Sequence, residues 1–143
     1  MKRLLSALAL SVAFAAPSTA LADEKEAETC LRNKIWNDYN DGWAVRTATT
    51  TKLAQGEHKI FLVTLYAGNQ YKLRVCADGK ASDVDLVLHN AKGEELARDQ
   101  ADDREPTIAF KPTATETFYV AVYMASTNAA GEKAGTALAV TFK

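Results

Sequence analysis

The fold of this chain is decided by the stretch from Asp83 to Tyr123, which reads DVDLVLHNAKGEELARDQADDREPTIAFKPTATETFYVAVY. Short apolar runs alternate with polar residues in this stretch, and turn-forming residues such as those at Asn90–Gly93 separate the runs. This pattern is typical of antiparallel β-strands joined by tight turns. The stretch predicts three strands and an acidic loop, with the strands at 84–89, 94–99 and 117–124.

The same period of two continues on both sides of this stretch. Eight short strands at regular spacing predict an all-β fold, a jelly-roll-like antiparallel β-sandwich. The remaining strands are expected at 43–51, 57–66 and 69–77 before this stretch, at 106–111 within it and at 135–142 at its C-terminal side. The expected inward-facing residues of the last two long strands are Phe118, Val120, Val122 and Met124, and Leu138, Val140 and Phe142.

The segment 23–42 has a different period. Ala27, Leu31 and Ile35 recur at four-residue spacing, which predicts a short N-terminal helix with one apolar face. The residues Asn40-Asp41-Gly42 supply a stop for this helix. The mature chain is therefore expected to be a single domain over 23–143, with the sandwich over 43–143.

The chain contains two cysteines, Cys30 and Cys76. In an oxidising compartment such an even pair is more often a structural disulfide than two free thiols. Cys76 alternates with apolar residues on the same side as Lys72 and Arg74, so it is expected to point away from the core. The predicted disulfide would tie the N-terminal helix to the outside of a sheet.

Residues 1–22 resemble an export signal. Two basic residues precede an apolar run over 4–16, and small residues occupy the −3 and −1 positions at Ala20 and Ala22. The run is shorter than the roughly 20 residues needed to span a bilayer. We therefore expect cleavage after Ala22, a periplasmic or secreted location, and no membrane insertion after cleavage.

The charges of the chain exclude one class of partner. The formal net charge is −1, and acidic and basic residues are interspersed without a block of either sign. Nucleic-acid binding requires a concentration of basic residues, so no nucleic-acid partner is expected.

The strand from Asp83 to Leu88, the turn at Gly93, the loop Asp99–Glu105 and the strand Phe118–Tyr123 together resemble the bacterial pre-peptidase C-terminal domain. This family is a β-sandwich module appended to many secreted peptidases. The resemblance covers roughly residues 57 to 142, and one departure is that Ala114–Thr117 replace the glycine that usually precedes the last strand. The resemblance implies an accessory module that acts in targeting, in substrate binding or in keeping an enzyme soluble.

The collagen-binding modules of clostridial collagenases are similar in fold and hold calcium with carboxylates. For this chain the resemblance implies a possible calcium site, because clustered carboxylates supply the oxygen ligands that calcium prefers. The candidate ligands are Asp83, Asp85, Asp99, Asp102, Asp103 and Glu105. The alternative is a solvated acidic loop whose charges are neutralised by Arg98 and Arg104.

Three large aromatic residues, Trp36, Tyr39 and Trp43, lie near the predicted junction of the helix and the first strand. They could form a platform for a sugar or a peptide. Alternatively, Trp36 and Tyr39 pack the helix onto the sheet and Trp43 starts the first strand. The second interpretation is favoured, because aromatic anchors usually bury such junctions.

No enzyme motif is recognisable. There is no G-x-S-x-G sequence, neither His58 nor His89 lies beside a nucleophile motif, and both cysteines are expected to be bridged. The sequence therefore predicts an exported non-catalytic binding or accessory protein whose partner is a protein or a polysaccharide of the cell envelope or exterior. The alternatives are a secreted inhibitor or chaperone-like partner of a separate hydrolase, and a calcium-dependent stability module.

Overall fold

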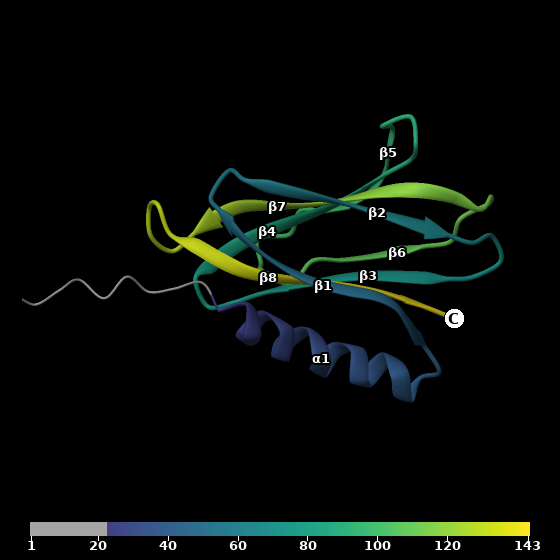
Figure 1. Ribbon diagram of the computed structural model, residues 1–143, viewed down its shortest axis with the longest axis horizontal. Helices are drawn as coiled ribbons and strands as arrows, with labels where there is room; N and C mark the ends of the chain where they lie inside the picture. The colour runs from purple at the N-terminus through teal and green to yellow at the C-terminus, as the bar shows by residue number, and fades with distance from the viewer. Residues whose placement is uncertain (1–22) are drawn as a thin grey trace, which may run out of the picture.

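The computed structural model describes residues 23–143, which form one helix and eight strands (Figure 1). The predicted export signal at 1–22 lies outside the described residues. The elements are α1 (Glu24–Asn40), β1 (Ala44–Ala54), β2 (His58–Leu65), β3 (Tyr71–Ala77), β4 (Ala81–His89), β5 (Glu95–Asp99), β6 (Thr107–Phe110), β7 (Glu116–Thr127) and β8 (Lys133–Phe142). Each predicted strand is present, with ends that differ by up to three residues.

The strands form two four-stranded sheets. The first sheet has the order β1-β8-β3-β6 and the second has the order β2-β7-β4-β5. All strand pairs are antiparallel. This order is that of a jelly roll, in which consecutive strands repeatedly cross between the two sheets. The predicted all-β jelly-roll-like sandwich is thus confirmed.

The hydrophobic core lies between the two sheets. The predicted inward face of β7 is confirmed, since Phe118, Val120, Val122 and Met124 are all buried. On β8, Leu138 and Val140 are buried, and Phe142 packs against the core from a partly exposed position. Alternate residues of β7 and β8 therefore face the core, as expected for β-strands.

Helix α1 lies along the outer face of the first sheet, against β8, β3 and β1 (Figure 1). Its buried residues Ala27 and Leu31 pack against Ala137 and Ala139 of β8, where small side chains allow a close approach. The carboxylate of Asp23 caps the helix by accepting hydrogen bonds from the backbone N–H groups of the second and third helical residues. Within residues 23–143, no helix has the length and apolar character that a membrane span requires.

Candidate functional site

A disulfide joins the middle of α1 to β3. Cys30 and Cys76 are bonded, with their Cα atoms 6.0 Å apart. Cys76 is fully buried under the helix and faces away from the core between the sheets, as its alternation with the apolar residues of β3 predicts. The disulfide therefore fixes α1 on the outside of the first sheet.

A buried ion-pair network holds the C-terminal end of α1. The carboxylate of Asp38 is almost fully buried and accepts hydrogen bonds from Lys72 Nζ at 2.7 Å and from Arg74 Nε at 2.7 Å. Burial alone would raise the pKa of Asp38, but the hydrogen bonds and charges of Arg74 and Lys72 outweigh it and leave the pKa below its ordinary value. The network is therefore charged at neutral pH.

Sequence reasoning missed Asp38, although a signal for it was present. Lys72 and Arg74 lie on the same side of β3 as Cys76, and the predicted disulfide places the helix over that side. Two cations covered by a helix require an acidic residue on the helix, because a buried charge is costly without a partner. Asp38, two turns after Cys30, is the residue that meets this requirement.

Trp43 joins this network from the residue before β1. Lys72 Nζ lies 4.2 Å from the centroid of the Trp43 ring, in the geometry of a cation–π contact. The same ammonium group thus contacts Asp38 and Trp43. Trp43 is partly buried, and it precedes the first strand by one residue.

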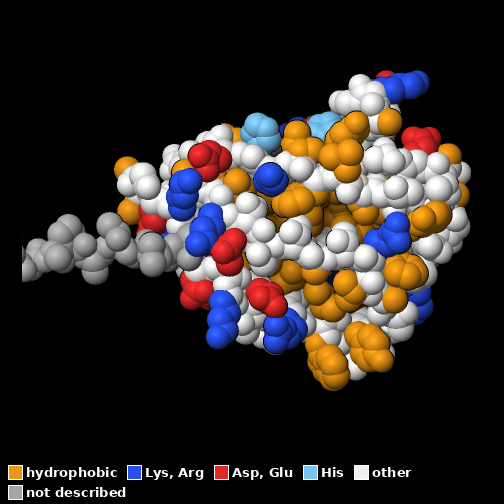
Figure 2. Space-filling view, viewed as in Figure 1, with side chains coloured by type: hydrophobic (Ala, Val, Ile, Leu, Met, Phe, Trp, Pro, Cys, Tyr) orange, Lys and Arg blue, Asp and Glu red, His pale blue; other side chains and the backbone are white. Residues whose placement is uncertain are grey.

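Trp36 and Tyr39 do not pack the helix onto the sheet, so the favoured interpretation of these two residues is wrong. Each is 63% exposed, and their rings stack on each other with centroids 5.8 Å apart. At about 100° per residue, Trp36 lies on the opposite side of the helix from Ala27, which faces the sheet. Asp38 takes the inward position at this end of the helix. Large apolar side chains accordingly stand out beside the C-terminal end of α1 (Figure 2).

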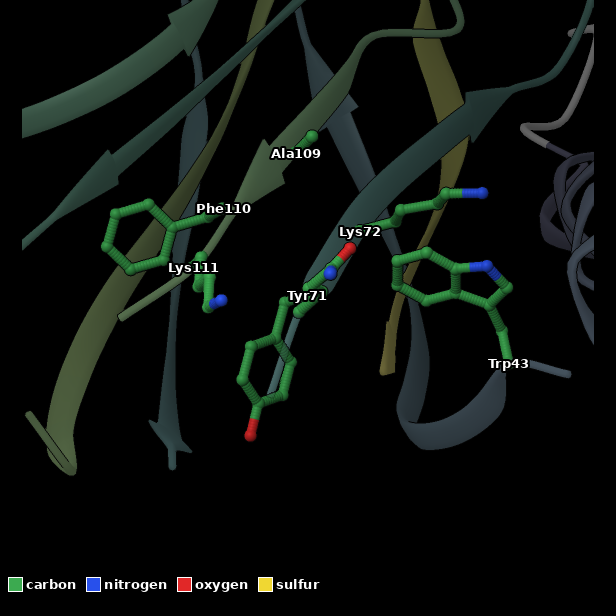
Figure 3. A pocket seen from close by; sticks show the side chains of 7 residues that line it. Trp43, Tyr71, Lys72, Ala109, Phe110 and Lys111 are labelled. Carbon is green, nitrogen blue, oxygen red and sulfur yellow. The ribbon is translucent and has the colours of Figure 1, made fainter. Parts of the chain in front are cut away.

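A pocket of about 380 Å³ opens beside Trp43, across the ends of β3 and β6. Figure 3 shows the rings of Trp43 and Phe110 on opposite sides of the pocket, with the Tyr71 ring between them. Lys111 lies beside Phe110, and the side chain of Lys72 runs over the Trp43 ring. The walls are therefore largely aromatic, and Lys111 contributes positive charge, whereas the charge of Lys72 is paired with Asp38. We call Trp36, Tyr39, Trp43 and this pocket the aromatic end of the molecule.

The acidic residues predicted to bind calcium lie on β4, at the end of β5 and in the loop before β6. Backbone N–H groups already occupy several of their oxygens: Asp99 accepts from Ala101 and Thr107, and Asp103 accepts from Glu105. The carboxylate of Glu105 pairs with Lys34 on α1 at 2.6 Å. These contacts tie the loop to itself and to the helix.

Two of these carboxyl groups have raised pKa values. Burial raises the pKa of Asp83, and the negative charges of Asp102 and Asp103 add to this effect. Burial also raises the pKa of Asp85, together with the charge of Asp83 and despite the opposite effect of Arg98. The acidic residues are thus close enough to repel one another.

The structure does not gather the six predicted ligands into a compact metal site. Within residues 23–143, the group of three or more potential ligand atoms that lie within 4.8 Å of one another consists of Cys30, Cys76 and Glu105. Its two sulfur atoms are joined in the disulfide and cannot act as thiolate ligands. Calcium binding by the acidic loop stays a prediction.

The chain is similar in fold to several solved structures. No protein-family model and no curated protein matches this chain. The crystal structure of Aeromonas hydrophila PliG, a periplasmic lysozyme inhibitor of g-type lysozyme, is similar at 17% sequence identity and a TM-score of 0.47. The match covers 68% of this chain and 85% of that chain. The resemblance to the pre-peptidase C-terminal domain stays a prediction.

Proposed function

We propose that this chain is an exported, non-catalytic binding protein that engages a partner protein through its aromatic end. The observation that carries the proposal is the stacked pair of Trp36 and Tyr39, each 63% exposed on the outer side of α1. Tryptophan and tyrosine are enriched among the residues that dominate the binding energy of protein interfaces. The disulfide supports the export part of the proposal, because such bonds persist in oxidising compartments.

The rigidity of the supporting helix favours binding. The disulfide at Cys30 holds α1 in its middle, and the ion pairs of Asp38 hold it one residue before Tyr39. A partner would therefore meet aromatic rings whose positions are already fixed. Pre-organisation of this kind reduces the entropy that is lost on association.

The shape of the aromatic pair favours a protein over a polysaccharide. Because the two rings stack on each other, they form a protruding knob in which each ring has one face covered by its neighbour. Such a knob suits a pocket on a protein surface, whereas a sugar platform needs open ring faces. The adjacent pocket, with Lys111 among its lining residues, suits an acidic or polar side chain of the same partner.

The hydrolase inhibitor predicted as an alternative from the sequence is a narrower form of this proposal. A rigid protruding knob beside a charged pocket is a shape that can occupy the cleft of an enzyme. Inhibition differs from other kinds of binding in that the captured partner is an enzyme and loses its activity when this chain binds.

The proposal is tested by affinity capture from a periplasmic extract on the immobilised mature chain, followed by purification of the captured protein and calorimetric titration. We expect the double variant Trp36→Ala/Tyr39→Ala to bind the purified partner at least ~10-fold more weakly at an unchanged melting temperature, because both side chains are exposed. The matched control is Leu62→Ala, which removes an apolar side chain of similar exposure from β2.

Two results would oppose the proposal. Equal affinity of the wild-type chain and the double variant for the partner would show that Trp36 and Tyr39 are not part of the interface. Co-sedimentation of the chain with purified cell-wall polysaccharide, abolished in the double variant, would identify the wrong class of partner. If the purified partner is a hydrolase, loss of its activity on addition of the wild-type chain alone would support the inhibitor form.

A further inference from the structure

Asp78 is a fully buried carboxylate that forms no ion pair with a side chain of residues 23–143. It follows β3 and is 0% exposed. Its oxygens accept hydrogen bonds from three backbone N–H groups, those of Asp23 at 2.7 Å, Lys80 at 3.0 Å and Gly135 at 3.0 Å. None of the ion pairs within residues 23–143 includes Asp78. An ionised carboxylate in this position is costly unless a positive charge lies close to it.

The surroundings of Asp78 are shaped to receive the backbone of Asp23. A Cβ atom at Gly135 of β8 would lie 2.6 Å from the carbonyl carbon of Asp23 and 2.7 Å from its oxygen. No side chain fits there, so glycine is the residue that permits this approach. The strand thus leaves room for one specific segment, the start of α1, beside the buried carboxylate.

The residue at this position is also the predicted first residue of the mature chain. We propose that Asp78 is the counter-ion of the mature N-terminus, and that cleavage after Ala22 creates the positive charge that Asp78 lacks. Hydrolysis of the Ala22–Asp23 amide bond by a signal peptidase consumes one water molecule. The water oxygen becomes part of the carboxylate on Ala22, and the amine released on Asp23 takes up a proton to become an ammonium group. The hydrogen bond from the uncharged amide N–H of Asp23 to the Asp78 carboxylate in the precursor becomes an ion pair.

The helix gives a second reason for a carboxylate here. An ammonium group at the N-terminal end of a helix is unfavourable, because the helix dipole already places partial positive charge there. The negative charge of Asp78 offsets this repulsion. The side chain of Asp23 caps the helix by accepting hydrogen bonds from the backbone N–H groups of Lys25 and Glu26. Since successive Cα atoms are about 3.8 Å apart, cleavage one residue earlier or later would move the ammonium group away from Asp78.

The test compares three forms of the mature chain: one with a free amine on Asp23, one acetylated at that amine, and one extended by Ala22. We expect both blocked forms to melt lower than the free form, by about 5 °C. In the Asp78→Asn background the three forms should have the same melting temperature, because the partner of the ammonium group is gone. Equal melting temperatures in the wild-type background, or an undiminished difference in Asp78→Asn, would overturn the proposal.

Two further measurements keep the proposal testable if Asp78→Asn fails to fold. Acylation of the Asp23 amine at neutral pH should be at least ~10-fold slower in the folded wild-type chain than in a peptide of its first residues, since the ion pair with Asp78 holds the amine in its protonated, non-nucleophilic form. An equal rate would count against the ion pair. Mass spectrometry of the exported protein should find Asp23 as the first residue, and a different first residue would contradict the proposal directly.

Discussion

The outer faces of the two sheets differ in what covers them. On the first sheet, α1 covers Lys72, Arg74 and Cys76 of β3, so that Cys76 is buried and the two cations are partly buried. On the second sheet, no element of residues 23–143 packs over the outward side chains, and Ile60 and Leu62 of β2 are exposed apolar residues. We call these the covered face and the bare face.

This difference shows that residue polarity does not by itself report burial in a sandwich. The covered face is polar and buried because the helix brings partners for each polar group, a sulfur for Cys76 and a carboxylate for the two cations. The bare face carries apolar side chains in the register rows formed by β2, β7 and β4. Stability is therefore expected to depend strongly on the covered face and weakly on the bare face.

The largest expected effect comes from the disulfide of the covered face. Replacing both Cys30 and Cys76 with alanine should lower the free energy of unfolding by about 4 kcal/mol, the loop-entropy value for a sequence separation of 46 residues. Urea denaturation of the mature chain measures this loss. A loss below about 1 kcal/mol would show that the contacts of α1 alone hold the helix in place.

Two leucines of β2 provide a matched pair that tests the bare face. Leu65 is 0% exposed and Leu62 is 66% exposed on the opposite side of the strand. Leu65→Ala should cost about 3 kcal/mol, because it leaves a cavity in the core, whereas Leu62→Ala should change the free energy of unfolding by less than about 0.5 kcal/mol. A large loss from Leu62→Ala in thermal denaturation would mean that this face is covered in solution.

The third effect concerns Asp38 and its pH dependence. Asp38→Asn should lower the free energy of unfolding at pH 7 by about 2 kcal/mol, a value below that of a fully buried pair because Lys72 and Arg74 are partly exposed. The lowered pKa of Asp38 means that its stabilising contribution is full above the unfolded pKa and is lost as the pH falls through the folded pKa.

The difference between wild type and Asp38→Asn should therefore shrink when urea denaturation is repeated in acid. The matched control is Asp41→Asn, which changes an exposed carboxylate at the C-terminal cap of α1, three residues after Asp38. A difference of unchanged size at low pH would show that the ion pairs are not its cause.

The sequence predicts the strands well because each strand carries its own signal. In β7, for example, apolar residues alternate from Phe118 to Met124 and define the inward face without reference to any other part of the chain. On α1, the four-residue spacing of Ala27, Leu31 and Ile35 is a local signal of this kind, and it predicts the face that packs on the sheet. At the C-terminal end of α1 the inward position is taken by Asp38, whose partners Lys72 and Arg74 lie more than 30 residues later in the chain. Trp36 and Tyr39 were assigned to the wrong side because this long-range pairing has no local pattern.

The burial of Asp78 was hidden for the same reason. Asp78-Gly79 is a turn signal in the sequence, and a turn is present there. Its carboxylate is enclosed by Asp23 and Gly135, which are 55 and 57 residues away in the chain. Local patterns thus predict strands and turns, whereas sites assembled from distant elements require the structure.

The smallest expected effect belongs to Asp85, which lies on the bare face. There the negative charge of Asp83 repels its carboxylate and the positive charge of Arg98 attracts it. Its raised pKa means that the ionised form disfavours the folded state above the folded pKa, and that this penalty disappears as the pH falls through that pKa toward the unfolded value. Asp85→Asn should therefore raise the melting temperature slightly at pH 7 and leave it unchanged near pH 3. The exposed Glu116→Gln serves as a control that should have no effect at either pH.

Repeating the Asp85→Asn measurement with calcium tests whether the acidic residues bind this metal. If the carboxylates bind calcium as the sequence predicts, added calcium should raise the melting temperature of the wild-type chain, because a ligand that binds the folded state stabilises it. Asp85→Asn should then abolish that gain, and its own effect at pH 7 should change sign when calcium is present. If instead calcium leaves both melting temperatures unchanged, repulsion among carboxylates is the whole of what Asp85 contributes, and the bare face has no role for the metal.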